Sequence, residues 1–115
     1  MIRLKNKELN VLNSALISLG NHQKDITKKW EIAKFTKKVD DAFSLFSAQV
    51  QTLINEQGKD DEKGNKLLNA NNSDYLRLLD LNIDIDIQKM TIEELEKFNP
   101  SIQELMGLAC IIEEE

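Results

Sequence analysis

A long apolar repeat without a break is the feature that most constrains how this chain can fold. Its members recur three and four residues apart, which is the spacing of a helix that buries one face. Neither proline nor glycine interrupts the repeat before Gly58. The sequence therefore predicts a helix of about 30 residues, about 45 Å long at 1.5 Å per residue. The repeat comprises Ile32, Phe35, Val39, Ala42, Phe46, Val50 and Leu53, widened by Phe43 and Ile54.

A shorter helix is predicted before the long one. Asn6 is expected to cap its start, and Gly20–Asn21 to end it, because glycine suits the C-terminal cap. Asp25 or Thr27 is expected to cap the long helix. Two such helices joined by a short turn form a helical hairpin over residues 6–57, and the excess length of the second must pack elsewhere or against another chain. The apolar face of the short helix consists of Leu9, Leu12, Leu16 and Leu19.

The chain after the hairpin changes in character. Residues 57–72 are rich in turn formers and predict a connector. Ser73 is expected to cap a short helix, after which apolar and polar residues alternate from Leu81 to Ile87. Strict alternation predicts a strand with one buried face, and Asp84 and Asp86 make its other face acidic.

The sequence does not decide which segment pairs with this strand. Residues 1–4 and residues 65–69 are both candidates. If residues 1–4 pair with the strand, Arg3 is expected to face the acidic side chains.

Two short helices are expected to close the chain. Thr91 with Glu94 and Ser101 with Glu104 match the capping-box pattern that starts a helix. The last helix is expected to present one apolar face, followed by an acidic tail that frays. We therefore expect a single α+β domain over residues 1–115, predominantly α-helical, with residues 73–115 as its strand and C-terminal helices. The face of the last helix would comprise Ile102, Leu105, Ala109 and Ile112.

Charge is divided unevenly along the 115 residues, whose formal net charge is −5. Residues 1–57 hold nine basic and six acidic side chains, a net +3, whereas residues 58–115 hold six basic and fourteen acidic ones, a net −8. Such a chain can orient a copy of itself or meet a basic partner. No apolar run approaches the length of about 18–20 residues that spans a bilayer, and the start lacks a signal-peptide core. We therefore expect no membrane association.

Catalytic and metal-binding chemistry has little to build on. The chain has one cysteine, Cys110, and one histidine, His22, whereas a catalytic thiolate needs a nearby base. The segment from Asp80 to Asp84 matches only the first half of a calcium loop, with Ile85 where that loop needs glycine. We therefore expect no enzymatic activity, no cofactor, no bound metal and no small-molecule substrate.

Five residues are the candidates for contact with a partner. Asp84 and Asp86 would offer an acidic face to a basic surface. Trp30, Lys34 and Lys38 lie in a lysine-rich stretch at the start of the long helix. Phosphate contacts use such lysines, but the sequence pI near 4.9 disfavours nucleic acid. The other interpretations are a solvated outer face for the lysines and a core or interface position for Trp30.

Four segments together resemble a known group of proteins. Leu-Lys-Asn-Lys-Glu-Leu at Leu4–Leu9 leads, the acidic turn Asp60–Asn65 and the segment Ile85–Leu95 follow, and Pro100–Glu115 ends the series. In these segments the chain is similar to a group of short proteins of unknown function that phages of low-GC bacteria encode. The resemblance implies a phage protein and carries no site residue with it.

The expected function is therefore a non-enzymatic phage accessory protein that acts through protein–protein contacts or self-association. It would serve in virion assembly or as a minor virion component, in the host cytoplasm or in the virion. The alternative is a small acidic inhibitor or antitoxin that binds a basic surface of a host enzyme. The sequence leaves the partner and the oligomeric state open.

Overall fold

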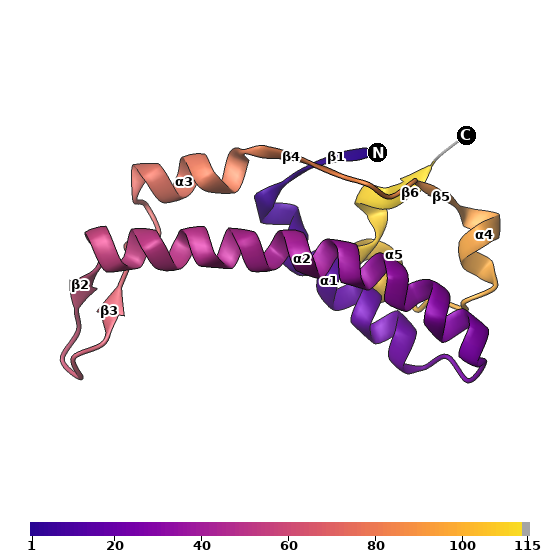
Figure 1. The fold of residues 1–115 in the computed structure, drawn as a ribbon. Helices are drawn as coiled ribbons and strands as arrows, with labels where there is room; N and C mark the ends of the chain where they lie inside the picture. The colour runs from indigo at the N-terminus through magenta and orange to yellow at the C-terminus, as the bar shows by residue number, and fades with distance from the viewer. Residues whose placement is uncertain (114–115) are drawn as a thin grey trace.

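Two helices of unequal length, α1 (Asn6–Asn21) and α2 (Ile26–Gln57), form the hairpin on which the chain is built (Figure 1). The computed structural model describes residues 1–113. It confirms the α+β, mostly helical class and the long second helix. The other elements are β1 (Ile2–Lys5), β2 (Lys59–Asp60), β3 (Lys66–Leu67), α3 (Ser73–Asp80), β4 (Asn82–Ile85), β5 (Met90–Thr91), α4 (Ile92–Glu96), α5 (Ile102–Gly107), the 3-10 turn η1 (Ala109–Ile111) and β6 (Ile112–Glu113).

The ends of α2 follow the predicted signals. α1 ends at Asn21, as the Gly20–Asn21 pair predicted, but its C-terminal cap is His22 and not the expected glycine. Asp25 caps α2, its carboxylate accepting hydrogen bonds from the backbone of Thr27 and Lys28, and the helix stops before Gly58. In α1 the N-terminal cap is Lys5, so the prediction that Asn6 caps the helix is wrong by one residue. The Asn6 side chain is instead buried.

Asn6 has a different role because α3 passes beside the start of α1. Its Nδ2 donates a hydrogen bond of 2.8 Å to the carbonyl of Leu78. The buried amide therefore links the first turn of α1 to α3, a contact that no local pattern in the sequence indicates.

The core lies between α1, the first half of α2 and the C-terminal elements. All four leucines of the α1 stripe are fully buried, whereas α2 buries only Ile32 and Val39. This follows from length, because α1 has 16 residues and α2 has 32. The remaining core residues are Ile2, Leu4, Ala15, Ile85, Ile87, Met90, Leu95, Phe98, Leu108 and Ile111.

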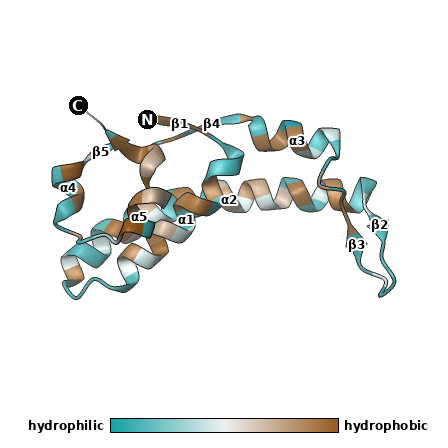
Figure 2. Cartoon of the chain, turned by 180° about the vertical axis from the view of Figure 1, so that it is seen from behind, coloured by the Kyte–Doolittle hydropathy of each residue, from teal (hydrophilic) through white to brown (hydrophobic). Residues whose placement is uncertain are grey.

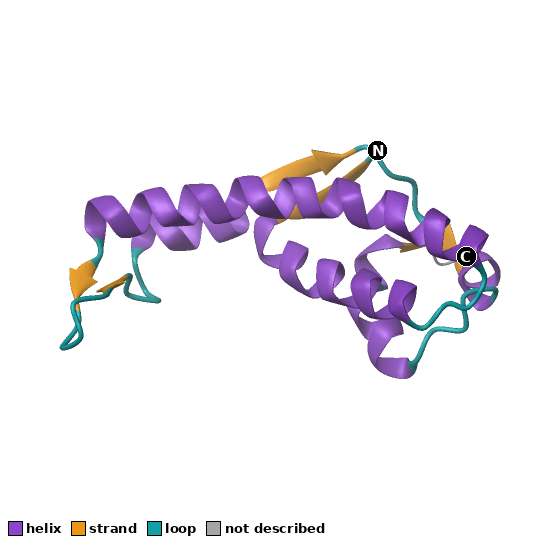
Figure 3. Ribbon diagram, turned by 60° about the horizontal axis from the view of Figure 1, so that its bottom comes forward, coloured by secondary structure: helices purple, strands orange, loops and turns teal. Residues whose placement is uncertain are grey.

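Residues 40–57 of α2 lead from the edge of the core to well beyond it, and we call this half of the helix the arm. Ala42, Phe43 and Phe46 still pack against the core, partly buried. No side chain of the arm is fully buried. α3 lies alongside the arm, and the β2–β3 hairpin lies at the far end of the arm (Figure 3). Hydrophobic residues nevertheless continue along the arm and α3 (Figure 2). The arm accounts for the elongated shape of the molecule, which measures 48 × 29 × 22 Å.

β1 is the partner of the predicted strand. It runs antiparallel to β4, with Ile2 opposite Ile85 and Leu4 opposite Ile83. Arg3 faces Asp84, as expected for this pairing, with 3.2 Å between Arg3 Nε and Asp84 Oδ1. The other candidate segment pairs elsewhere, since β3 forms its hairpin with β2.

The ends of the predicted strand and of the helix before it need correction. β4 covers only Asn82–Ile85, and Leu81 ends α3 with 53% of its surface exposed rather than lying on the buried face. The cap of α3 is Asn72, whose side chain accepts a hydrogen bond from the backbone of Tyr75, and not Ser73.

The C-terminal segment departs most from the sequence-based prediction. Both capping boxes are present, at Thr91 and at Ser101. However, the last helix ends at Gly107, and β6 pairs in parallel with β5. The predicted apolar face is therefore only partly right. Leu105 and Ile112 pack against the core, but Ile102 is 78% exposed and Ala109 is exposed, while Leu108 and Ile111 enter the core instead. The acidic tail expected to fray is Glu113–Glu115. The prediction is wrong for Glu113, which belongs to β6 and pairs with Thr91, and residues 114–115 lie outside the described residues.

Close approach of α5 to α1 explains why this helix buries an unexpected face. A Cβ placed on Gly107 would lie 2.6 Å from the Cβ of Ala15. Only a residue without a side chain allows this distance. The small pair therefore sets the distance between the two helices.

Gly107→Ala is expected to lower the free energy of unfolding by about 1–3 kcal/mol, because relief of overpacking requires a backbone shift. The clash outweighs the better helix propensity of alanine, about 1 kcal/mol. Urea denaturation followed by circular dichroism measures the change. The control is the double variant Ala15→Gly/Gly107→Ala, in which the methyl group has moved across the contact. A single variant as stable as the parent chain would contradict the prediction.

Candidate interaction groove

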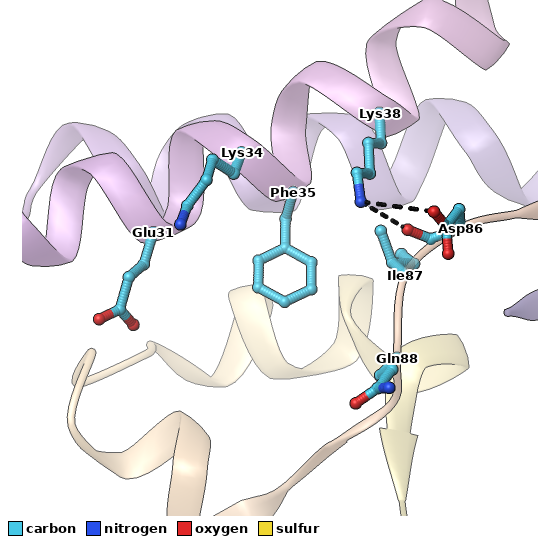
Figure 4. Close-up of a pocket in the computed structure, with 7 residues that line it drawn as sticks. All are labelled: Glu31, Lys34, Phe35, Lys38, Asp86, Ile87 and Gln88. Carbon is cyan, nitrogen blue, oxygen red and sulfur yellow. Dashed lines mark hydrogen bonds and ion pairs between the residues drawn. The ribbon is translucent and has the colours of Figure 1, made fainter.

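A groove opens between α2 and the segment that follows β4 (Figure 4). Its volume is about 390 Å³. Phe35 and Ile87 supply its apolar surface, and both belong to or pack against the hydrophobic core. Charged side chains of both signs surround this surface. The lining residues are Glu31, Lys34, Phe35, Lys38, Asp86, Ile87 and Gln88.

Helical spacing determines which side chains of α2 line the groove. Lys34 and Lys38 are four residues apart and therefore lie on one face of the helix. The Lys38 amine donates a hydrogen bond of 2.7 Å to the backbone carbonyl of Asp86 and lies 4.0 Å from its carboxylate. This contact ties the segment after β4 to α2. The carboxylate of Asp86 remains accessible, since its side chain is 86% exposed.

Lys34 differs from the other charged groups of the groove. Glu31 pairs with Lys97 at 3.0 Å, and Lys38 contacts Asp86. Lys34, by contrast, forms no ion pair with any residue that the structure describes. The groove therefore combines an apolar surface with one cation that is free to pair with an incoming carboxylate.

The structure brings three of the five candidate residues together. Lys34, Lys38 and Asp86 all line the groove. Asp84 lies on β4, where it pairs with Arg3. Trp30 lies on the outer face of α2 with 64% of its surface exposed, so the core position offered for it is wrong and the interface position stays a prediction. The acidic row predicted from the alternating strand is thus divided, with one carboxylate paired and one at the groove.

A second polar cluster, missed at the level of sequence, lies between the end of α1 and the start of α5. Glu104 is buried, and its carboxylate accepts hydrogen bonds from Ser18 Oγ at 2.7 Å and from the Ser101 backbone at 2.8 Å. His22 Nε2 lies 2.9 Å from the same carboxylate. The capping box predicted Glu104 as a helix cap, but no sequence signal linked it to residues more than 80 positions earlier.

The ionisation of Glu104 follows from this environment. Burial acts to raise the pKa of its carboxyl, but the hydrogen bonds from Ser18, Ser101 and His22 outweigh burial. The pKa of Glu104 therefore lies below its ordinary value of 4.5. The cluster joins α1 to α5 through a carboxylate that stays charged at neutral pH.

Cys110 and His22 are not brought together. Cys110 is half-buried and packs at the edge of the core. Burial raises the pKa of its thiol, and the charge of Glu8 raises it further. Glu8 belongs to the first turn of α1, whereas His22 follows the last. Residues 1–113 contain no group of three or more histidine, cysteine, aspartate or glutamate side chains placed to hold a metal ion.

Comparison with known proteins indicates no function for the chain. Within residues 1–113, no helix combines the length and the apolar character that crossing a membrane requires. No family model matches the chain, and neither a curated protein nor a solved structure matches it.

Proposed function

We propose that this chain is a non-enzymatic phage accessory protein that acts by binding another protein, in virion assembly or as a minor virion component. It would act in the host cytoplasm or within the particle. The observation that carries the proposal is the groove between α2 and the segment after β4, with its apolar surface and unpaired Lys34. The phage setting rests on the sequence resemblance.

The groove suits a protein ligand because it offers two kinds of contact side by side. An apolar side chain of the partner would pack on Phe35 and Ile87. A neighbouring carboxylate would then reach Lys34. Interfaces commonly combine a buried apolar anchor with charged contacts at the rim, which add specificity and speed association. A partner segment with an apolar residue beside an acidic one is the ligand that this surface favours.

The chemistry of the two reactive side chains supports contact rather than catalysis. A raised pKa keeps the thiol of Cys110 protonated, which makes it a poor nucleophile. His22 is engaged with the buried carboxylate of Glu104. Neither residue lines the groove.

The alternative, an acidic inhibitor or antitoxin, receives less support. It would use Asp84 and Asp86 together against a basic surface. Asp84 is already paired with Arg3, so binding would have to break that contact. Asp86 alone stays accessible, and it borders the groove.

Photo-crosslinking in cells infected by the source phage tests the proposal. A photoreactive amino acid at the exposed groove residue Gln88 is expected to capture a virion structural protein, identified by mass spectrometry. Lys34→Glu is expected to reduce this product at least tenfold, the effect of losing about 1.4 kcal/mol of binding free energy. The matched control Lys63→Glu reverses a charge in the β2–β3 hairpin loop and is expected to leave the yield unchanged.

Two outcomes would argue against the groove. The first is the absence of any captured virion protein. The second is a product whose yield Lys34→Glu does not alter. Capture of a host enzyme, lost when Asp86 is replaced by asparagine, would favour the inhibitor alternative instead.

A further inference from the structure

We propose that two copies of this chain associate through the outer face of α2, antiparallel and around a twofold axis that crosses this outer face at the level of position 39. The surface concerned lies opposite the two residues through which α2 enters the core, Ile32 and Val39. This inference needs neither the groove nor an external partner. It adds self-association to the proposed function.

A line of exposed side chains runs along this outer face, and we call it the ridge. Every member is exposed to solvent. Two are large apolar residues, Trp30 with 64% and Leu45 with 65% of its surface exposed. Two more are alanines, and the central two are a lysine and an aspartate. The ridge comprises Trp30, Ala33, Lys37, Asp41, Leu45 and Ala48.

The spacing of the ridge is the same when read from either end. Successive members are three, four, four, four and three residues apart, which is symmetric about position 39. If a second α2 runs antiparallel across this point, each ridge residue of one copy lies opposite a ridge residue of the other copy. A twofold interface must be self-complementary in this way.

The residues that would meet are complementary in size and in charge. Trp30 of one copy would lie against Ala48 of the other, and Leu45 against Ala33. Large side chains would therefore pack on small ones. Lys37, which pairs with Asp41 of its own helix at 2.7 Å, would also face Asp41 of the second copy. The centre would then be a ring of four alternating charges.

The charge of the whole helix favours the same orientation. Residues 26–39 hold five lysines and one glutamate, a net +4, whereas residues 40–57 hold two aspartates and one glutamate, a net −3. An antiparallel pair places each positive half beside the negative arm of the other copy. A parallel pair would place like charges together, so electrostatic complementarity selects the antiparallel arrangement.

The size of the contact sets the expected strength. The ridge is about 27 Å long at 1.5 Å per residue. A single helix pair of this length falls at the small end of specific interfaces, near or below about 1,200 Å² in total. We therefore expect a weak dimer, with a dissociation constant of the order of 10 μM, that forms at high local concentration.

Sedimentation equilibrium of the full chain at low salt tests the dimer and its geometry. Lys37→Asp gives a ring of four negative charges and Asp41→Lys a ring of four positive ones, so each variant alone is expected to weaken association at least tenfold. The double variant Lys37→Asp/Asp41→Lys restores alternation and is expected to regain it. An equimolar mixture of the two single variants is expected to form a heterodimer.

A second pair of variants tests the apolar contact. Trp30→Ala is expected to weaken association at least tenfold. The matched control is Met106→Ala, which removes an apolar side chain that is 73% exposed on α5, away from the ridge. Circular dichroism of each variant checks that the monomer is folded, which the exposure of both residues favours.

Three results would overturn the inference: a chain that is monomeric up to about 500 μM, far above the expected dissociation constant; a dimer that the ridge variants leave unchanged; or single variants that do not pair with each other. None of these results touches the groove, whose crosslink depends on Lys34. Conversely, loss of the groove proposal would leave the dimer measurement as it stands.

Discussion

Phe98→Ala is expected to lower the free energy of unfolding by about 3–5 kcal/mol, the usual effect of removing a buried phenylalanine. Phe98 is 1% exposed and is among the largest fully buried side chains of the protein. Its backbone carbonyl accepts a hydrogen bond of 2.6 Å from Gln23, which ties it to the turn between α1 and α2. A cavity here would therefore loosen the C-terminal elements and the helical hairpin together.

The expected loss is large compared with the total stability of a small domain, about 5–15 kcal/mol. Urea denaturation followed by circular dichroism measures it. Trp30→Ala is the matched control, since it also removes an aromatic ring but at an exposed position. At a protein concentration below that of dimer formation, this control is expected to change stability by less than about 0.5 kcal/mol. A loss below 1 kcal/mol for Phe98→Ala would contradict the burial of its ring.

Glu104→Gln is expected to lower the free energy of unfolding by about 2 kcal/mol at pH 7, because hydrogen bonds to a charged acceptor contribute about 1.5–3 kcal/mol. The amide keeps the shape of the side chain but has only one acceptor oxygen. In the parent chain, the two oxygens of the Glu104 carboxylate accept the hydrogen bonds from Ser18, His22 and the Ser101 backbone. At least one of these groups would lose its partner inside the protein.

The effect is expected to depend on pH with a definite sign. The pKa of Glu104 in the folded protein lies below its ordinary value of 4.5. A carboxyl with a lowered folded pKa stabilises the fold above its ordinary pKa, and this stabilisation is lost as the pH falls through the folded value. The difference between the parent chain and Glu104→Gln should therefore be full at pH 7 and smaller at pH 3.

The other capping box provides the control for Glu104. Glu94 has the same place in the box begun by Thr91, but it is exposed, and among the described residues its carboxylate accepts hydrogen bonds from Thr91 alone. Glu94→Gln is expected to reduce stability by less than about 1 kcal/mol, with little change between pH 7 and pH 3. Equal effects of the two substitutions would show that Glu104 acts only as a cap.

Local patterns were sufficient to predict most of the elements, because each depends on neighbours within a few residues. Asp25 caps α2, Gly58 follows its end and both capping boxes form, since a cap needs only its own side chain and the next turn. The exact capping residue differs from the prediction in two helices. Lys5 and Asn72 are the caps where Asn6 and Ser73 were expected, because a neighbouring polar side chain can satisfy the same backbone groups.

Burial was harder to predict because it depends on which elements meet. The stripe on α2 continues to Leu53, but α1 covers only the first half of it, so the arm has no fully buried residue. In the last helix, the approach of Gly107 to Ala15 turns Leu108 rather than Ile102 toward the core.

The candidate site shows the same division. Helical spacing alone places Lys34 beside Lys38. Asp86 lies near these lysines because of the path that the chain takes after β4, and no periodic pattern in the sequence predicts that path. The contact between His22 and Glu104 could likewise not be predicted, because hydrogen bonds between distant segments produce no repeating pattern in the sequence.

The sequence by itself therefore determined where most helices lie, the cap of α2 and both capping boxes, the length of α2, the presence of the alternating strand and the change of charge along the chain, since all of these arise from neighbouring residues. The tertiary structure alone decided that β1 pairs with β4, that the far end of α2 extends beyond the core, that Trp30 is exposed and that Glu104 is buried. The physical reason is that burial and pairing are properties of two surfaces in contact. A linear pattern describes only one of those surfaces at a time.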